Sequence, residues 1–396
     1  MPIPAFSFAR IPRIDFGQGT FETIAPILAS FGTRVLCVTG HQSLRRTSYW
    51  PRLEAMWAEH ALHVDTLSLA GEPSPQWVDE AVRTFRAQDI HAVLGIGGGS
   101  VLDAAKAIAG LLRPGNSIMD HLEGVGPEQP YRGPSTPFVA VPTTAGTGAE
   151  ATRNAVLTVT GRHGFKKSFR DEQLVARHAI VDPDLLASCP PALIAANGMD
   201  ALTQLIESYV SLRANPLSDA LALSGLDAAK AGLLQWYETG EAAVDARTDM
   251  AYAALLSGIT LAHVGLGAVH GLAAPLGAFH AVPHGVACGT VLAAATRINI
   301  EALRAREPGH RALRKYAQLG RLVGHPPSAD DRQAQDALCE TLEDWTRRLN
   351  LPRLSTFGIG THDIAHIVGH SRGSSMKTNP LVLTDDELHA IVAQRL

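Results

Sequence analysis

The chain has 396 residues, with 38 acidic side chains against 34 basic ones and a net charge of −4, which argues against broad binding to nucleic acid or to an anionic membrane. Its hydrophobic fraction of 46% and charged fraction of 18% exclude a disordered or collagen-like chain and are typical of a compact soluble protein of two or three domains. The four cysteines form no CxxC pair, and the first residues lack the apolar run of a secretory signal, so we expect a cytoplasmic protein without a disulfide framework.

The first half of the chain alternates β-rich runs with helical patterns. Its strand candidates are continuously apolar, which is typical of a parallel sheet covered by helices on both faces. In chain order we expect strands at 34–40, 62–70, 92–96 and 138–141, and helices at 49–60, 77–88 and 101–112. This order predicts an N-terminal α/β domain.

The second half is rich in Ala and Leu, and strand signals nearly vanish there. Turn-forming Asp and Pro residues at 182–191 mark the change, so we divide the chain into an α/β domain at 1–187 and an all-helical domain at 188–396. Helical patterns occur at 191–212, 216–239, 246–262, 313–324 and 334–349.

One uncharged stretch invites a membrane interpretation. Residues 250–296 contain no Asp, Glu, Lys or Arg, yet they carry four histidines and seven glycines. A membrane-spanning helix needs about 20 predominantly apolar residues, and only 250–262 is continuous in this way. We therefore expect a buried helix that leads into a histidine-rich active-site segment, and no membrane contact.

A glycine-rich turn follows the predicted strand at 92–96 and opens the next helix. The run GIGGGSVLDAAK spans 95–106, where Ser100 can cap the helix and Asp103 follows three residues later. Glycines let a phosphate approach the backbone, and a helix N-terminus favours an anion. The run is not the GxGxxG fingerprint, and such a turn alone is more often structural than functional.

A second turn rich in glycine and hydroxyl groups follows the strand at 138–141. In PTTAGTGAEATRN the hydroxyls come from Thr143, Thr144 and Thr147. Two such turns at neighbouring strand ends would form a polar cleft at the carboxyl edge of the sheet, where ligands bind in open α/β folds. An ordinary Ser/Thr-rich loop is the alternative.

The helical half offers a set of metal ligands. Asp200 and Gln204 lie four residues apart, on one helical face, while His270 and His284 flank a stretch whose glycines and prolines favour turns. Each histidine alone is more often a hydrogen-bonded core residue. Two histidines and one carboxylate in the least charged part of the chain indicate a divalent-metal site.

A rival histidine face occurs near the end of the chain. His362, His366 and His370 recur at four-residue spacing, but Asp363 points off their face. We therefore expect a solvated histidine stripe there.

Four motifs, taken together, resemble the iron-containing, group III alcohol dehydrogenase family. GIGGGSVLDAAKAIA, PTTAGTGAEAT, GMDALTQLIESYVS and GLGAVHGLAAPLGAFHAVPHG occur in this order, and the resemblance runs from FGQG at 16–19 to Asn379 and Pro380. It implies a Rossmann-like dinucleotide domain and an all-α domain, in a dehydroquinate synthase-like architecture. NAD or NADP and a divalent metal, Fe(II) or Zn(II), would occupy the cleft between them.

The resemblance also implies roles for individual residues. Asp200, His270 and His284 would bind the metal. At the place of the family's remaining ligand, Gln204 would add its amide oxygen as a neutral fourth donor or leave the place to water. Lys166 would contact the nicotinamide ribose. The other cofactor residues would be Gly97, Gly98, Gly99, Ser100, Asp103, Thr143, Thr144 and Thr147; Gly40 is a further candidate because it ends the strand at 34–40.

The implied reaction transfers a hydride between an alcohol or carbonyl substrate and the nicotinamide. The metal would act as a Lewis acid on the substrate oxygen. His270 would act in catalysis as a ligand, and His280 or a water chain past the ribose would take the proton. Phe279 and His280 are candidates for lining the substrate pocket.

Two positions depart from the family pattern. The family usually has histidine where this chain has Gln204 and Ala274, which puts the metal and the proton route in question. A metal-free reductase of the maleylacetate type is therefore an alternative, and a dehydroquinate-synthase-like lyase is a third.

Two further expectations concern the cofactor and the assembly. The strand at 34–40 ends in Gly40, with Arg45 and Arg46 close behind, and no acidic residue stands there to repel a 2′-phosphate. We therefore expect NADP(H) to be accepted at least comparably to NAD(H). The family resemblance implies a homodimer formed through the first domain.

Overall fold

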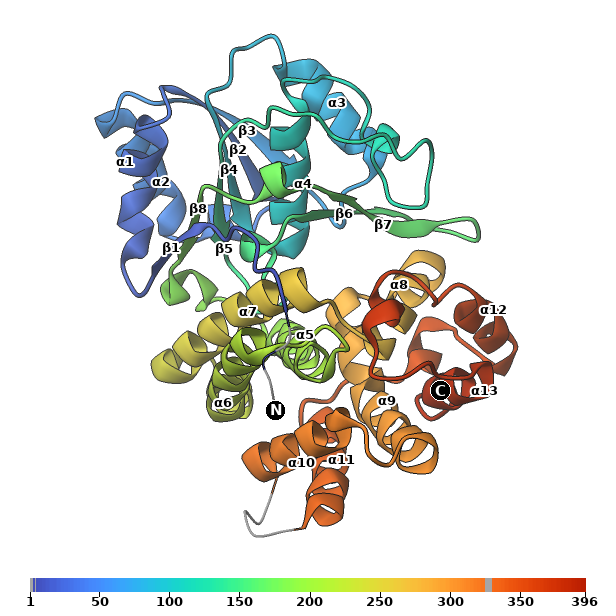
Figure 1. Ribbon diagram of the computed structural model, residues 1–396. Helices are drawn as coiled ribbons and strands as arrows, with labels where there is room; N and C mark the ends of the chain where they lie inside the picture. The colour runs from blue at the N-terminus through green and yellow to red at the C-terminus, as the bar shows by residue number, and fades with distance from the viewer. Residues whose placement is uncertain (1–2, 4, 325–329) are drawn as a thin grey trace.

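The computed structural model describes residues 3, 5–324 and 330–396. Figure 1 shows an α/β half, coloured blue to green, stacked on a helical half, coloured yellow to red. Both predicted halves, and with them the predicted fold class, are confirmed.

Six parallel strands form the sheet of the first half, in the order β1-β8-β5-β4-β2-β3. The chain leaves β2 for the edge strand β3 and then returns to the other side of β2 as β4, so the winding direction reverses between β2 and β4. In open α/β sheets this reversal opens a ligand-binding crevice at the carboxyl ends of the strands. The strands are β1 (Arg13–Phe16), β2 (Arg34–Gly40), β3 (His63–Leu69), β4 (Ala92–Gly97), β5 (Phe138–Pro142) and β8 (His178–Val181).

Helices cover both faces of this sheet, which explains why its strands are continuously apolar. In β2, Val35 and Cys37 join the core with α1 and α2, while Leu36 and Val38 join the core with α3 and α4. Successive side chains of a strand point to opposite faces, so both sets must be apolar. The helices are α1 (Ile24–Ala29), α2 (Tyr49–Glu59), α3 (Pro75–Phe85) and α4 (Gly99–Leu111).

An antiparallel hairpin of β6 (Asn154–Val159) and β7 (Phe165–Arg170) lies beside α4 and reaches over the helical half (Figure 1). We did not expect these strands. Most side chains of β7, in the run FKKSFR, are only half-buried, and such a polar run carries little apolar signal.

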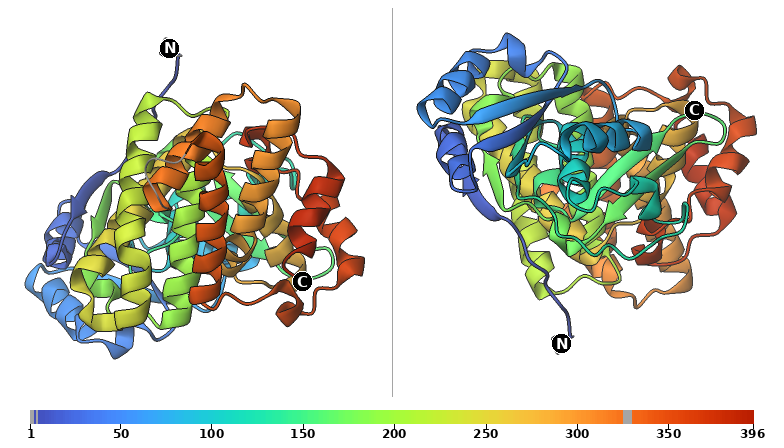
Figure 2. Two further views of the ribbon diagram at one scale, coloured as in Figure 1. Left: turned by 90° about the horizontal axis from the view of Figure 1, so that it is seen from below. Right: turned by 90° about the horizontal axis from the view of Figure 1, so that it is seen from above.

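The helical half is organised around α5, which packs against α6, α7 and α9. Seen from below, its long helices lie side by side under the sheet domain (Figure 2, left). The helices are α5 (Pro191–Val210), α6 (Pro216–Thr239), α7 (Val244–Val264), α8 (Ala268–His280), α9 (His284–Arg306), α10 (Arg311–Val323), α11 (Asp331–Arg348), α12 (Ile364–Gly369) and α13 (Asp385–Ala393).

The turns that we expected around His270 and His284 are largely absent, and this expectation was wrong. His270 lies inside α8, which continues through Pro275, and His284 is the first residue of α9. Almost every side chain from 268 to 278 is buried, so tertiary packing outweighs the helix-breaking tendency of glycine and proline.

By length and composition alone, α9 could cross a membrane, and the bent pair of α7 and α8 passes the same test jointly. In the fold, 78% of the apolar window of α9 is buried inside the protein. Its composition is therefore that of a core helix.

Candidate active site

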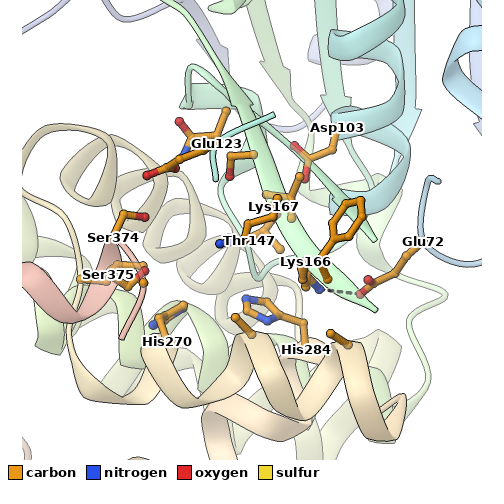
Figure 3. A pocket seen from close by; sticks show the side chains of 18 of the residues that line it. Glu72, Asp103, Glu123, Thr147, Lys166, Lys167, His270, His284, Ser374 and Ser375 are labelled. Carbon is orange, nitrogen blue, oxygen red and sulfur yellow. Dashed lines mark hydrogen bonds and ion pairs between the residues drawn. The ribbon is translucent and has the colours of Figure 1, made fainter. Parts of the chain in front are cut away.

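A cavity of about 360 Å³ lies between the two halves and receives side chains from both. Gly99, Ser100 and Thr147 line it from the sheet domain, and His270 and His284 line it from α8 and α9. Figure 3 shows Thr147 and Lys166 facing the two histidines across this space.

The two glycine-rich turns meet at the carboxyl edge of the sheet, as expected. The Thr143 amide donates to the Gly97 carbonyl at 2.9 Å. A Cβ atom at Gly99 would lie 2.5 Å from Thr147 Oγ1, which no side chain permits. Glycine at this position therefore lets the second turn rest on the start of α4.

The predicted cofactor residues gather at this edge. Gly40 ends β2, and a Cβ there would lie 3.9 Å from Val101 Cγ2 on α4. Gly99, Ser100, Asp103, Thr147 and Lys166 line the cavity itself, whereas Gly97, Gly98, Thr143 and Thr144 form the adjoining backbone turns.

Asp103 lies between the cavity and a buried lysine. Burial raises the pKa of its carboxyl to about 6, although Lys106, whose Nζ lies 3.8 Å away, works in the opposite direction. The Lys106 ammonium donates to Ala149 O, Thr152 Oγ1 and Asn154 O at 2.7–2.8 Å. Lys106 thus ties α4 to the second turn and to β6.

Lys166 has a partner that the sequence did not reveal. Its ammonium lies 2.6 Å from Glu72 Oε1, and both residues line the cavity (Figure 3). Burial would raise the pKa of Glu72, but Lys166 and the hydroxyl of Thr158 lower it below its usual value. Glu72 follows the carboxyl end of β3.

Asp200, His270, His284 and Cys288 bring their donor atoms within 4.8 Å of one another. Asp200 Oδ1 is 3.3 Å from His270 Nε2 and 3.8 Å from His284 Nε2, and the Cys288 sulfur is 3.8 Å from His284 Nε2. The fold therefore unites the three ligands expected from the sequence, although 84 residues separate Asp200 from His284.

Two of these donor atoms are buried without any hydrogen-bond partner. Asp200 Oδ1 and His270 Nε2 are both in this state, and their residues are 1% and 7% exposed. An unpaired buried polar atom costs about 1–3 kcal/mol, and a divalent cation between these donors would satisfy both. This donor set fits a divalent metal.

The charges of the cluster shape its pKa values. Burial would raise the pKa of Asp200, but His284 and His270 bring it down to about 2. Burial, with Lys166 and His270 nearby, lowers the pKa of His284 to about 4. These two shifts favour the forms that bind metals, a carboxylate and a neutral imidazole. The pKa of His270 moves the other way: burial would lower it, but Cys288, Asp200 and Glu207 raise it well above its usual value, so a metal bound there must displace a proton.

Gln204 is buried one helical turn after Asp200 and also lines the cavity. Its Oε1 atom accepts a hydrogen bond of 2.7 Å from the Ser257 hydroxyl on α7. The amide oxygen expected to serve as the fourth donor thus already has a protein partner.

The sequence did not reveal two neighbours of the cluster. Glu207, two helical turns after Asp200, accepts from His270 Nδ1 at 2.6 Å, and Cys288 lies one turn after His284. The spacing itself was a usable signal, because residues seven apart on α5 (Asp200 and Glu207) or four apart on α9 (His284 and Cys288) lie on one face of a helix. An acidic residue in a helix and a lone cysteine, however, more often have other roles.

Aromatic rings gather at the far end of α8. Phe279 and His370 line the cavity, and the ring of His366 lies 4.5 Å from that of Phe279. His362, His366 and His370 are all exposed, as expected of a solvated stripe, but the rings of His366 and His370 also pack against Phe279. His280 ends α8 and is not among the cavity-lining residues that the structure describes.

Comparison with known proteins identifies the family. Residues 12–183 match the family model described as iron-containing alcohol dehydrogenase, and residues 194–396 match the model of the C-terminal part of the Fe-containing alcohol dehydrogenase family. Alcohol dehydrogenase 4 of Saccharomyces cerevisiae is 32% identical over 387 residues, covering 96% of each chain. NAD-dependent methanol dehydrogenase of Bacillus methanolicus is 29% identical over 97% of this chain and 98% of its own.

A solved structure agrees. Sulfoacetaldehyde reductase of Bifidobacterium kashiwanohense, in complex with NAD+, superposes with a TM-score of 0.85 at 26% identity, covering 99% of each chain. The family models, the shared fold and the order of the motifs all indicate the same family. The chain therefore belongs to the iron-containing alcohol dehydrogenase family and is an oxidoreductase that acts on CH–OH groups and the corresponding carbonyls.

Proposed function

We propose that the protein is an alcohol dehydrogenase or aldehyde reductase that depends on NAD(P) and on a divalent metal, Fe(II) or Zn(II). The observation that supports this most is a single cavity that runs from the turn at Gly99 and Thr147 to the cluster of Asp200, His270 and His284. A dinucleotide bound along the turn would bring its reactive end toward the cluster.

Each part of the cavity has a task in this proposal. The backbone at Gly97–Ser100 and the N-terminus of α4 bind the pyrophosphate, and Lys166 holds the nicotinamide ribose. Asp200, His270 and His284 hold the metal. When bound, the metal supplies Lewis acidity toward the substrate oxygen, and the nicotinamide supplies the hydride chemistry.

The proton leaves through His280 or through water past the ribose. His280 is half-buried at the end of α8, and Ala274, which lines the cavity, offers no proton carrier. Water or His280 would connect the cluster to solvent in this proposal.

The substrate is a small alcohol or aldehyde. Leu261, Leu266, Pro275 and Phe279 add apolar side chains to the cavity wall. Three relatives are named for methanol, lactaldehyde and 1-propanol, and these compounds with the corresponding alcohols and aldehydes form the first test panel.

The experiment follows reduced-nicotinamide absorbance with this panel, with NAD(H) and NADP(H), before and after chelation. We expect turnover that chelation removes and that Fe(II) or Zn(II) restores. Asp200→Ala and His270→Ala should lose both metal and turnover, whereas His362→Ala, at an exposed position, should keep both. Active protein without stoichiometric metal, unaffected by chelation, would overturn the metal role.

A metal-free reductase of the maleylacetate type is the second candidate. The observation that favours it is the engagement of Gln204 Oε1 by Ser257, which leaves the cluster without the donor expected there. A lyase of the dehydroquinate synthase type would show no net change in nicotinamide absorbance.

We also propose that the protein is a cytoplasmic homodimer. Ile3, Phe6 and Ile11 are exposed in the segment before β1, and β1 is an edge strand of the sheet. A second copy could cover both features. Light scattering that detects only a 42.0 kDa species at micromolar concentration would contradict the dimer.

A further inference from the structure

We propose that Cys288 is the fourth ligand of the metal, so that the donor set of this chain is Asp200, His270, His284 and Cys288. The inference deepens the proposed function, since it rests on a metal being bound in this cluster. It assigns to the α9 cysteine the place that Gln204 does not fill.

The spacing of the donor atoms supports this set. A tetrahedron of ligands about 2.0–2.3 Å from Zn(II) has edges of about 3.3–3.8 Å. The measured edges are 3.3 Å between His270 Nε2 and Asp200 Oδ1, 3.8 Å between His284 Nε2 and Asp200 Oδ1, and 3.8 Å between His284 Nε2 and the Cys288 sulfur. These three edges match such a tetrahedron, and all four donor atoms lie within 4.8 Å of one another.

The helices fix this arrangement. His284 and Cys288 are four residues apart on α9, so their side chains leave the same face of the helix. Cys288 is fully buried, and its sulfur lies on the side where Asp200 Oδ1 and His270 Nε2 have no hydrogen-bond partner. The unpartnered atoms and the sulfur therefore belong to one cluster.

Gln204 is the competing donor, and its contacts count against it. Its amide oxygen accepts from the Ser257 hydroxyl at 2.7 Å, and that hydroxyl also lies 2.8 Å from the Ala254 carbonyl. A metal on this oxygen would have to share it with the buried hydrogen bond from Ser257, whereas the Cys288 sulfur has only a weak contact of 3.8 Å with His284 Nε2.

Coordination by Cys288 converts a thiol into a metal thiolate, and the released proton goes to solvent. Thiolate is a softer ligand than imidazole or an amide oxygen, so this set should favour Zn(II) over Fe(II) relative to an all-nitrogen and oxygen set. The chain would thus have exchanged a histidine on α5 for a cysteine on α9.

The test replaces the metal with Co(II) and records the absorption spectrum of the full-length protein without nucleotide. We expect one Co(II) per chain and a near-ultraviolet thiolate-to-Co(II) charge-transfer band. In Cys288→Ser this band should vanish, and Co(II) should bind at least about tenfold more weakly. Cys339→Ser, which changes another buried cysteine on a helix of the same half, should keep both the band and the affinity.

A second variant separates the two candidate donors. Gln204→Ala should keep the charge-transfer band, and its Co(II) affinity should change by less than about threefold. Loss of Co(II) from Gln204→Ala, with no change in Cys288→Ser, would overturn the inference.

If Cys288→Ser fails to fold, the Co(II) spectrum of the unmodified protein still tests whether Cys288 is a ligand. Stoichiometric Co(II) without a thiolate band would refute the role of Cys288 and leave the metal-dependent function intact. No binding of Co(II) at all would overturn both.

Discussion

Glu207 on α5 accepts hydrogen bonds from α8 with both carboxylate oxygens, one from the ring of His270 and the other from the backbone of Val269. Oε2 accepts from His270 Nδ1 at 2.6 Å, and Oε1 accepts from the Val269 amide at 2.7 Å. This pairing directs Nε2 of His270 toward Asp200 and the cluster. Such carboxylate–histidine pairs fix the tautomer and orientation of a metal ligand.

Glu207→Gln should therefore weaken metal binding. An amide offers one accepting oxygen where two donors must be satisfied, so either His270 or Val269 loses its partner. We expect the metal affinity to fall about 10- to 100-fold, measured by competition with a chromogenic chelator. Glu343→Gln, at an exposed site on α11, is the control, and equal affinities in the two variants would show that Glu207 does not support the ligand.

A second prediction concerns the position that departs from the family pattern. Gln204→His should tighten metal binding about tenfold or more, because it adds an imidazole, a strong donor for first-row metals, where the wild-type amide is engaged by Ser257. Combined with Cys288→Ser, it should restore most of the affinity that the serine variant loses. Gln394→His adds an imidazole at an exposed position and should have no effect. If Gln204→His leaves the affinity unchanged, position 204 does not reach the ion.

The fold was predictable where one physical signal dominated. The continuous apolar runs of β2, β4 and β5 predicted a parallel sheet, and the helices of the second half from α5 to α7 occur within two residues of their expected bounds. The helices α8 and α9 were not predicted, because side chains buried on nearly all sides leave no 3.6-residue periodicity, and glycine and proline indicated turns.

The site was predictable to the extent that residue types alone suggest chemistry. Asp200, His270 and His284 stood out because charged and histidine side chains are conspicuous in an apolar region. Cys288 and Glu207 did not stand out, since their relevance depends on burial and on which faces of α5 and α9 meet. Only the packed helices supply that information.

The end of β2 supports a third prediction, about the cofactor. After Gly40, the first acidic residue is Glu54, and Arg45 lies 4.1 Å from the centre of the Trp50 ring. Nothing on this segment would repel a 2′-phosphate, so kcat/KM with NADP(H) should be at least comparable to that with NAD(H). A preference for NAD of about a hundredfold or more, roughly 2.7 kcal/mol, would contradict it.

Gly40→Asp should reverse this tolerance. A Cβ atom at Gly40 would lie 3.5 Å from Ser43 Oγ and 3.9 Å from Val101 Cγ2, both ordinary contacts, so the substitution fits the fold. The new carboxylate should lower kcat/KM for NADP(H) about 10- to 100-fold, or about 1.4–2.7 kcal/mol, and should spare NAD(H). Equal losses with both cofactors would indicate damage to the fold and not repulsion of the phosphate.

The fourth prediction concerns stability and pH. Glu150, in the second turn, is 3% exposed, and burial raises the pKa of its carboxyl from 4.5 to about 7, although its own backbone amide and Lys106 work in the opposite direction. Between these two values the folded protein holds a proton that the unfolded chain has released. The protonated Glu150 carboxyl thus contributes to the free energy of unfolding. This contribution is fully present below about pH 4.5 and is lost as the pH rises through about 7.

Glu150→Gln removes this titration and keeps the size of the side chain. We expect the free energy of unfolding of the variant, relative to the unmodified protein, to rise by on the order of 1–3 kcal/mol between pH 5 and pH 8. Urea unfolding at both pH values measures it. Asp103 and His284 also titrate near this range, but they are present in both proteins and cancel in the difference. Glu59→Gln, at the exposed end of α2, is the control, and its free energy of unfolding relative to the unmodified protein should not change between the two pH values. If the free energy of unfolding of Glu150→Gln changes with pH as it does in the unmodified protein, the Glu150 carboxyl titrates alike in the folded and unfolded states.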